Sequence, residues 1–94
     1  MSVRAHSVVL LTRAGCGLCA AALTELATVC ADFGLTPDAV DVDAAAATDP
    51  SLRAEYGDRL PVVLLNGREH SYFDVDEPRL RRDLSQPPRA GEPR

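Results

Sequence analysis

A Cys-x-x-Cys motif lies between a hydrophobic segment and a segment with helical spacing of apolar residues. Of all features of the sequence, this junction restricts the possible folds most. Residues Ser7–Thr12 form a short run of mostly apolar side chains, which Ala14-Gly15 ends. The run is continuous rather than alternating, which predicts a strand buried on both faces. Cys16 and Cys19 follow directly. A buried strand, a turn and a helix that begins at two cysteines together indicate an α/β domain.

The residues after the motif follow a helical repeat. Counted from the second cysteine, apolar residues recur at intervals of mostly three or four: Cys19, Ala22, Leu23, Leu26, Cys30 and Phe33. This spacing predicts one buried stripe on a helix from about Gly17 to Phe33. Gly34 follows at the position where a left-handed residue commonly ends a helix.

The middle of the chain predicts a shorter strand and a shorter helix. Val40–Asp43 alternates apolar and acidic residues, as a short strand does. The four alanines at 44–47 fit either a loop or the front of a helix. Asp49-Pro50 predicts an N-cap followed by proline at the first helical position, and Gly57 would end that helix.

The last third of the chain predicts a hairpin and a final helix. Leu60–Leu65 is a second apolar strand with a proline near its start. Asn66-Gly67 is the favoured two-residue hairpin turn, so residues 68–73 should return antiparallel. Asp76-Glu77-Pro78 then predicts the start of a helix.

Length and composition limit the chain to one small domain. A chain of 94 residues can bury one modest core, so we expect a domain at 1–84 and a disordered tail at 85–94, which holds three prolines. The net charge of −4 argues against a nucleic-acid partner. No stretch approaches the ~18 consecutive apolar residues of a membrane span, and no signal-peptide core is apparent. We therefore expect a cytoplasmic monomer.

The spacing of the two cysteines suits dithiol chemistry. Residues three apart on a helix lie on one face, close enough for a disulfide. The unpaired N–H groups and the dipole of the helix N-terminus favour the thiolate of Cys16, and Arg13 adds a nearby positive charge. Cys19 begins the buried stripe and should be shielded. We expect Cys16 to be the attacking nucleophile and Cys19 the resolving partner.

Three other interpretations of the motif stay open. A structural zinc site needs four ligands, and the remaining candidates, Cys30, His6 and His70, lack ligand-like spacing. An iron–sulfur cluster could bridge two chains with one thiolate from each and small thiols. A binding domain without redox activity could also keep the fold. Cys30 lies about 16 Å along the helix from Cys19, too far for a disulfide, and we expect it to be a core residue.

The motifs together resemble the thioredoxin superfamily, and most closely its small glutaredoxin-like proteins. Three landmarks recur in that order: the strand–Cys16-Gly17-Leu18-Cys19–helix unit, Leu60-Pro61 before a strand, and the Asn66-Gly67 hairpin. The resemblance covers about residues 7–84. It implies a thioredoxin-like three-layer α/β/α sandwich of order β-α-β-α-β-β-α. We expect a mixed four-stranded sheet with the first and last helices on one face and the middle helix on the other.

The resemblance also implies where a substrate lies. The Leu60-Pro61 bond would be cis, and the backbone of Leu60 would hydrogen-bond an extended substrate segment. The substrate would be a disulfide-containing protein or small molecule, reduced without a bound cofactor or metal by the redox-active disulfide of the motif. The residues expected to contact it are Arg13, Gly17, Leu18, Leu60, Pro61, Tyr72 and Asp74.

The sequence departs from the glutaredoxin pattern after the hairpin. Glutaredoxins usually place Gly-Gly and then Asp here to hold glutathione, where this chain has Ser71–Asp74. Bulky rings at Tyr72 and Phe73 argue against glutathione, although Asp74 could serve in part. The rings could instead line a substrate groove, or one could pack under the last helix. The external electron donor is either glutathione or a flavin-dependent thioredoxin-type reductase.

We expect four basic residues to be solvated or at a strand edge: His6, His70, Arg53 and Arg59.

Overall fold

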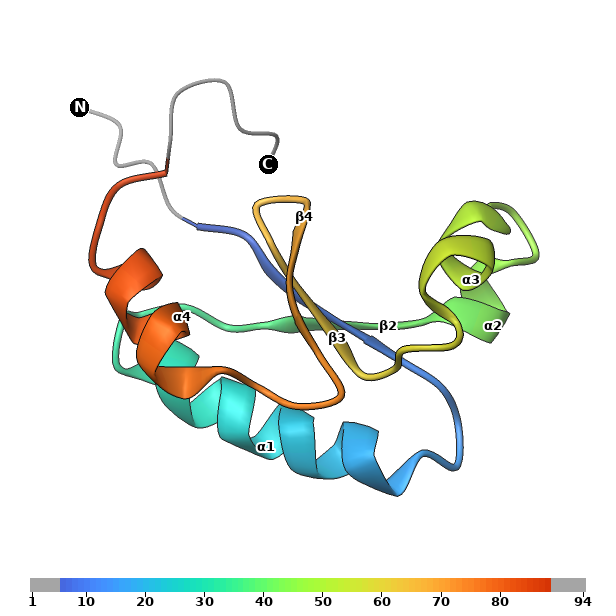
Figure 1. The fold of residues 1–94 in the computed structure, drawn as a ribbon, viewed down its shortest axis with the longest axis horizontal. Coiled ribbons are helices and arrows are strands. Elements are labelled where there is room, and N and C mark those ends of the chain that lie inside the picture. Colours follow the sequence, from blue (N-terminus) through green and yellow to red (C-terminus); the bar gives the residue numbers. More distant parts are fainter. Residues whose placement is uncertain (1–5, 89–94) are drawn as a thin grey trace.

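A mixed sheet with helices on both faces forms the part of the chain that the structure, a computed structural model, describes: residues 6–88 (Figure 1). Residues 1–5 and 89–94 lie outside the described part. The elements in chain order are β1 (Val8–Thr12), α1 (Gly17–Ala31), β2 (Asp38–Asp41), α2 (Val42–Ala45), α3 (Ser51–Tyr56), β3 (Val62–Leu65), β4 (Arg68–Tyr72) and α4 (Glu77–Leu84). The predicted order is confirmed, with one short helix, α2, added.

The four strands lie in the order β2-β1-β3-β4. β2 is parallel to β1, whereas β3 is antiparallel to β1 and to β4. The chain leaves β2 at Asp41, beside Thr12, and enters β3 at Val62, beside Leu11. It thus stays at one end of the sheet, because α2 and α3 are only about 6 and 9 Å long at about 1.5 Å per residue. Helices this short cannot carry the chain back to the other end of the sheet, so β3 must run antiparallel to β1.

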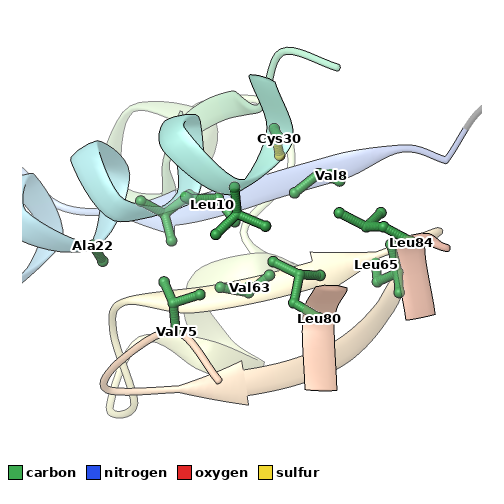
Figure 2. Close-up of a cluster of buried hydrophobic side chains, with 11 residues drawn as sticks. Val8, Leu10, Ala22, Cys30, Val63, Leu65, Val75, Leu80 and Leu84 are labelled. Atoms are coloured by element: carbon green, nitrogen blue, oxygen red, sulfur yellow. The ribbon is translucent and has the colours of Figure 1, made fainter. Parts of the chain in front are cut away.

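The first and last helices cover the same face of the sheet, as predicted. In Figure 2 the α1 side chains Ala22 and Cys30 lie over the sheet together with α4 side chains Leu80 and Leu84. The predicted stripe on α1 is confirmed, because Cys19, Ala22, Leu26 and Cys30 are buried and Leu23 and Phe33 pack against the core. Burial of these side chains supplies the main force that holds the two helices to the sheet.

The opposite face carries a smaller core under α2 and α3. Leu11, Val62 and Leu64 of the sheet pack here with Val42 and, at the margin, with Tyr56. Figure 1 shows α2 and α3 together at one end of the sheet, the end at which α1 begins. The three-layer arrangement is therefore present, but its second helical layer is short.

The hairpin and the last helix form as their sequence signals predict. Asn66 and Gly67 both have positive φ angles, 54° and 84°, as a type I′ turn requires. Asp76 caps α4, since its side chain accepts a hydrogen bond from the Arg79 N–H. Gly34, with a φ of 72°, follows α1, which ends at Ala31, two residues before the predicted end.

The middle elements differ from the prediction in their limits. The strand predicted at 40–43 lies at 38–41, because the Asp41 carboxylate caps α2 through the N–H groups of Asp43 and Ala44. The helix takes in the first two of the four alanines. The next helix, α3, begins one residue later than predicted, so that Pro50 rather than Asp49 is its N-cap. The Asp49 side chain lies just before the cap and accepts hydrogen bonds from Ser51.

The segment predicted as a tail begins directly after α4. Ser85 caps the helix C-terminus, and the Gln86 carbonyl oxygen lies 2.6 Å from Nε2 of His6. Nδ1 of the same His6 lies 2.9 Å from the Asn66 amide nitrogen. His6 is thus half-buried and bonded on both ring nitrogens, rather than solvated. The rest of the predicted tail, residues 89–94, lies outside the described residues.

Candidate active site

Cys16 stands at the N-cap of α1, as the sequence predicts. Its backbone is extended, with φ −88° and ψ 106°, and its sulfur accepts a hydrogen bond from the Cys19 N–H at 3.1 Å. The preceding Gly15 has a φ of 79°, a left-handed conformation that favours glycine. The Cys16 N–H closes this turn on the Arg13 carbonyl oxygen at 3.2 Å. The turn after β1 therefore places the Cys16 sulfur at the N-terminus of α1, which is the positive end of the helix dipole.

The two cysteines form a disulfide, with a Cα–Cα distance of 5.2 Å. Cys16 is half-buried, whereas Cys19 is only 4% exposed. Between them, Gly17 and Leu18 are exposed, and Leu18 keeps 63% of its surface accessible. One sulfur can thus be approached from solvent while its partner is sheltered by the core.

A groove of about 450 Å³ lies beside the disulfide. The end of β1, the loop after it, the first turns of α1 and Ala39 of β2 line this groove. Its walls are mostly small side chains. The groove leaves room for a substituent next to Cys16.

Arg13 lines this groove, but its charge is shared with a carboxylate. Its guanidinium donates to Asp43 at 2.7 and 3.2 Å and to the Gly57 carbonyl oxygen at 3.3 Å. The hydrogen bond to Asp43 raises the pKa of Arg13, and the same bond lowers the pKa of Asp43. Arg53 lies 3.6 Å from the same carboxylate. Arg13 thus links the loop before Cys16 to α2 and α3.

The Leu60–Pro61 peptide bond is cis. Pro61 is fully buried, and Leu60 is half-buried against the smaller core. The N–H and C=O of Leu60 make no hydrogen bond to other residues within 6–88. The backbone just before β3 therefore has one donor and one acceptor that no other residue within 6–88 uses.

The aromatic pair after the hairpin points outward. Tyr72 is 48% exposed and Phe73 is 50% exposed, and their rings meet edge-to-face with centroids 5.1 Å apart. The alternative that one ring packs under the last helix is wrong, because neither ring belongs to a buried cluster. Phe73 has a φ of 70°, and its N–H donates to the Pro61 carbonyl oxygen at 2.7 Å. Asp74 is exposed, and its carbonyl oxygen accepts from the Ser71 hydroxyl.

Arg59 is a residue of this region that sequence reasoning missed. We expected it to be solvated, but its guanidinium lies over the Tyr56 ring at 5.6 Å and the Tyr72 ring at 6.0 Å. At these distances a cation is attracted to the face of a ring. Arg59 also donates to the Glu55 carbonyl oxygen at 3.0 Å and lies 3.5 Å from Glu69. No local sequence signal predicts the contacts with Tyr72 and Glu69, because both of these residues lie in β4, whereas Arg59 lies in the loop before β3.

His70 lies on the edge strand β4 but is buried, with 5% of its side chain exposed. The register between β3 and β4 shifts at Val63/Leu64, so that His70 is an extra residue in β4. This bulge turns its ring toward α4, where Nε2 lies 2.8 Å from Asp83. The contact is structural and joins β4 to α4.

Three further observations concern metal binding, the third cysteine and membrane spans. Within residues 6–88, no group of three or more His, Cys, Asp or Glu side chains is placed to hold a metal ion. Cys30 is fully buried and unpaired, and burial raises the pKa of its thiol. In the same part of the chain no helix has the length and apolar character to cross a membrane.

Fold and site together define a small thioredoxin-like domain with a Cys-x-x-Cys pair at the start of its first helix. The solution NMR structure of protein Ne2328 from Nitrosomonas europaea has the same fold, with a TM-score of 0.73 over 89% of this chain and 96% of that one. Its sequence identity is 21%, so the likeness concerns the fold alone.

The chain belongs to the glutaredoxin-like domain family (DUF836), whose model matches residues 7–85. Among its relatives are the uncharacterized proteins Rv0508 of Mycobacterium tuberculosis and Mb0520 of Mycobacterium bovis. Each is 56% identical over 80 residues, which cover 84% of this chain and 82% of the relative.

Proposed function

We propose that the protein is a thiol–disulfide oxidoreductase that uses Cys16 as nucleophile and Cys19 as resolving thiol. One observation carries this proposal: an accessible sulfur at a helix N-cap is bonded to a sulfur that the core shields. A structural disulfide needs neither the helix terminus nor this asymmetry, whereas exchange through a mixed disulfide uses both.

The proposed reaction begins with the reduced pair. The Cys16 thiolate attacks one substrate sulfur, the substrate S–S bond breaks, and one substrate thiolate leaves. Cys19 then loses its proton and attacks the Cys16 sulfur, which releases the second substrate thiol. The products are a reduced substrate and the Cys16–Cys19 disulfide; two electrons and two protons from an external donor restore the dithiol.

The surroundings of the pair support a substrate bound across the end of the sheet. We infer that Leu60 binds an extended segment through its backbone, beside Pro61. The other proposed contacts are Arg13, Gly17, Leu18, Tyr72 and Asp74. The substrate is a disulfide-containing protein or small molecule, and the proposed setting is a monomer in the cytoplasm with no bound cofactor. The donor is glutathione or a flavin-dependent reductase.

Turnover of an insulin disulfide tests the proposal. The protein is supplied either with glutathione and glutathione reductase or with a thioredoxin-type reductase, each with NADPH. We expect activity with one of these donors. Cys16→Ser should abolish it, whereas Cys30→Ala, the matched control at the buried thiol, should retain it. Full activity of Cys16→Ser would overturn the mechanism, and stoichiometric zinc or iron in the purified protein would favour a metal module.

A further inference from the structure

Three large apolar side chains stand out as exposed in the described part of the chain: Leu18, Tyr72 and Phe73. The strand register brings them to one end of the sheet. Tyr72 pairs with Val62, and Val62 pairs with Leu11 at the end of β1, from which the chain turns into the helix that carries Leu18. Exposed apolar groups at the end of the sheet from which the chain leads to Cys16 indicate a recognition surface.

Phe73 holds an unfavourable backbone conformation. Its φ of 70° is left-handed, and a residue with a β-carbon adopts this conformation only at an energetic cost. The bond from its N–H to the Pro61 carbonyl oxygen keeps it there. The ring does not offset this cost in the core, since it is half-exposed and outside both buried clusters. Strain of this kind is often retained where the side chain serves a ligand.

Tyr72 is held in place on two sides. Its ring meets the Phe73 ring edge-to-face with an interplanar angle of 76°, and the Arg59 guanidinium lies over the Tyr72 ring. Arg59 is itself fixed by Glu69 and by the Glu55 carbonyl oxygen. The two rings therefore form one continuous apolar surface at the end of β4, which we name the aromatic platform.

We propose that the aromatic platform selects the substrate by binding an apolar side chain of an extended polypeptide next to the disulfide. This inference rests on the proposed function and names its substrate class as protein disulfides. The unpaired N–H and C=O of Leu60 suit an added strand, which gives affinity through the backbone and specificity through side-chain contacts.

Charge pairing at the site favours a polypeptide over a small acidic disulfide. Binding of glutathione disulfide would call for cations near the sulfurs, because any of its carboxylates that binding removes from water needs a partner. Arg13 is paired with Asp43, and Arg59 lies 3.5 Å from Glu69. An apolar side chain needs no such partner and would cover the two rings.

Single-turnover oxidation of the prereduced protein tests this proposal without any reductase. Three oxidants are compared: two disulfide peptides that differ only in Phe or Ser beside the cysteine, and hydroxyethyl disulfide. We expect the wild type to react roughly tenfold faster with the Phe peptide than with the Ser peptide. Phe73→Gly and Tyr72→Ser should each reduce this preference to about twofold, and each should slow the reaction with the Phe peptide more than the reaction with hydroxyethyl disulfide. Phe33→Ala, which changes the other phenylalanine, should keep the preference.

The possible results separate the two proposals. Equal rates for both peptides in the wild type, or an equal loss with all three oxidants in the platform variants, would overturn the role of the aromatic platform. Circular dichroism of each variant identifies an unfolded protein, and Tyr72→Ser provides the result if Phe73→Gly does not fold. A prereduced wild type that none of the three disulfides oxidises would instead contradict the proposed function itself.

Discussion

The Cys19 backbone N–H donates a 3.1 Å hydrogen bond to the sulfur of Cys16. A sulfur thus occupies the N-cap place that Ser, Thr, Asp or Asn usually takes. The N–H groups of the first helical turn have no partners within the helix, so a thiolate at this place is stabilised by them and by the helix dipole. The contact that starts the helix therefore lies where it would stabilise a thiolate on Cys16, as the proposed mechanism requires.

The thiols of the reduced protein should differ sharply in reactivity. We expect iodoacetamide to label Cys16 first at about pH 6, where an ordinary cysteine is mostly protonated. Cys30 should be labelled only after unfolding, because it is fully buried and burial raises the pKa of its thiol. Mass spectrometry of the labelled peptides measures both rates. Labelling of Cys30 in the folded protein as fast as Cys16 would contradict its placement in the core.

The ion pair between Arg13 and Asp43 predicts a dependence of stability on pH. The pKa of Asp43 is lowered in the folded state, chiefly by its hydrogen bond to Arg13. The stability that the ionised Asp43 contributes to the folded state is therefore fully present above the pKa of an unfolded Asp, about 4. This contribution is lost as the pH falls through the lowered pKa of Asp43 in the folded state. Asp43→Asn should be less stable than the wild type at neutral pH, and urea titrations should show the two converging in acid.

Asp58 offers the matched control for this measurement. Its side chain is 82% exposed, and its ion pair with Arg59 is long, at 3.8 Å. Asp58→Asn should change the free energy of unfolding little at any pH, as is usual for exposed pairs. A gap between wild type and Asp43→Asn that stays constant into acid would show that the ion pair does not cause it.

The contact between buried His70 and half-buried Asp83 should matter to stability but not to the reaction. Asp83→Ala leaves Nε2 of His70 buried without its partner, and Nδ1 already has none among residues 6–88. We expect a loss of about 1–3 kcal/mol in the free energy of unfolding, measured in urea. The control is Arg82→Ala, an adjacent change at a side chain that is 67% exposed, which should have little effect. No measurable loss in Asp83→Ala would mean that His70 finds another partner.

Much of the fold follows from local patterns in the chain. The continuous strand before Cys16, the apolar stripe behind it, and the Asn66-Gly67 turn each depend on neighbours a few residues away, and each forms as predicted. The N-cap position of Cys16 is local in the same sense. A local pattern of residues was therefore enough to predict the centre of the candidate site, the cysteine pair at the start of α1.

The features that the sequence did not reveal depend on distant partners. Arg13 donates a hydrogen bond to Asp43, thirty residues further along the chain, and the Arg59 guanidinium contacts aromatic rings from both α3 and β4. The bulge that buries His70 arises from the pairing of two strands rather than from β4 alone. Each of these depends on tertiary contacts that periodicity does not encode.

Capture of the mixed disulfide tests the central claim most directly. Removal of Cys19 leaves the first step intact but takes away the thiol that resolves the intermediate. Cys19→Ser, reduced and mixed with a disulfide peptide, should accumulate a covalent adduct of one peptide half on Cys16, seen by mass spectrometry and released by dithiothreitol. The double variant Cys16→Ser/Cys19→Ser is the control and should form none. An adduct on Cys30, or no adduct on Cys16, would contradict the assignment of Cys16 as the nucleophile.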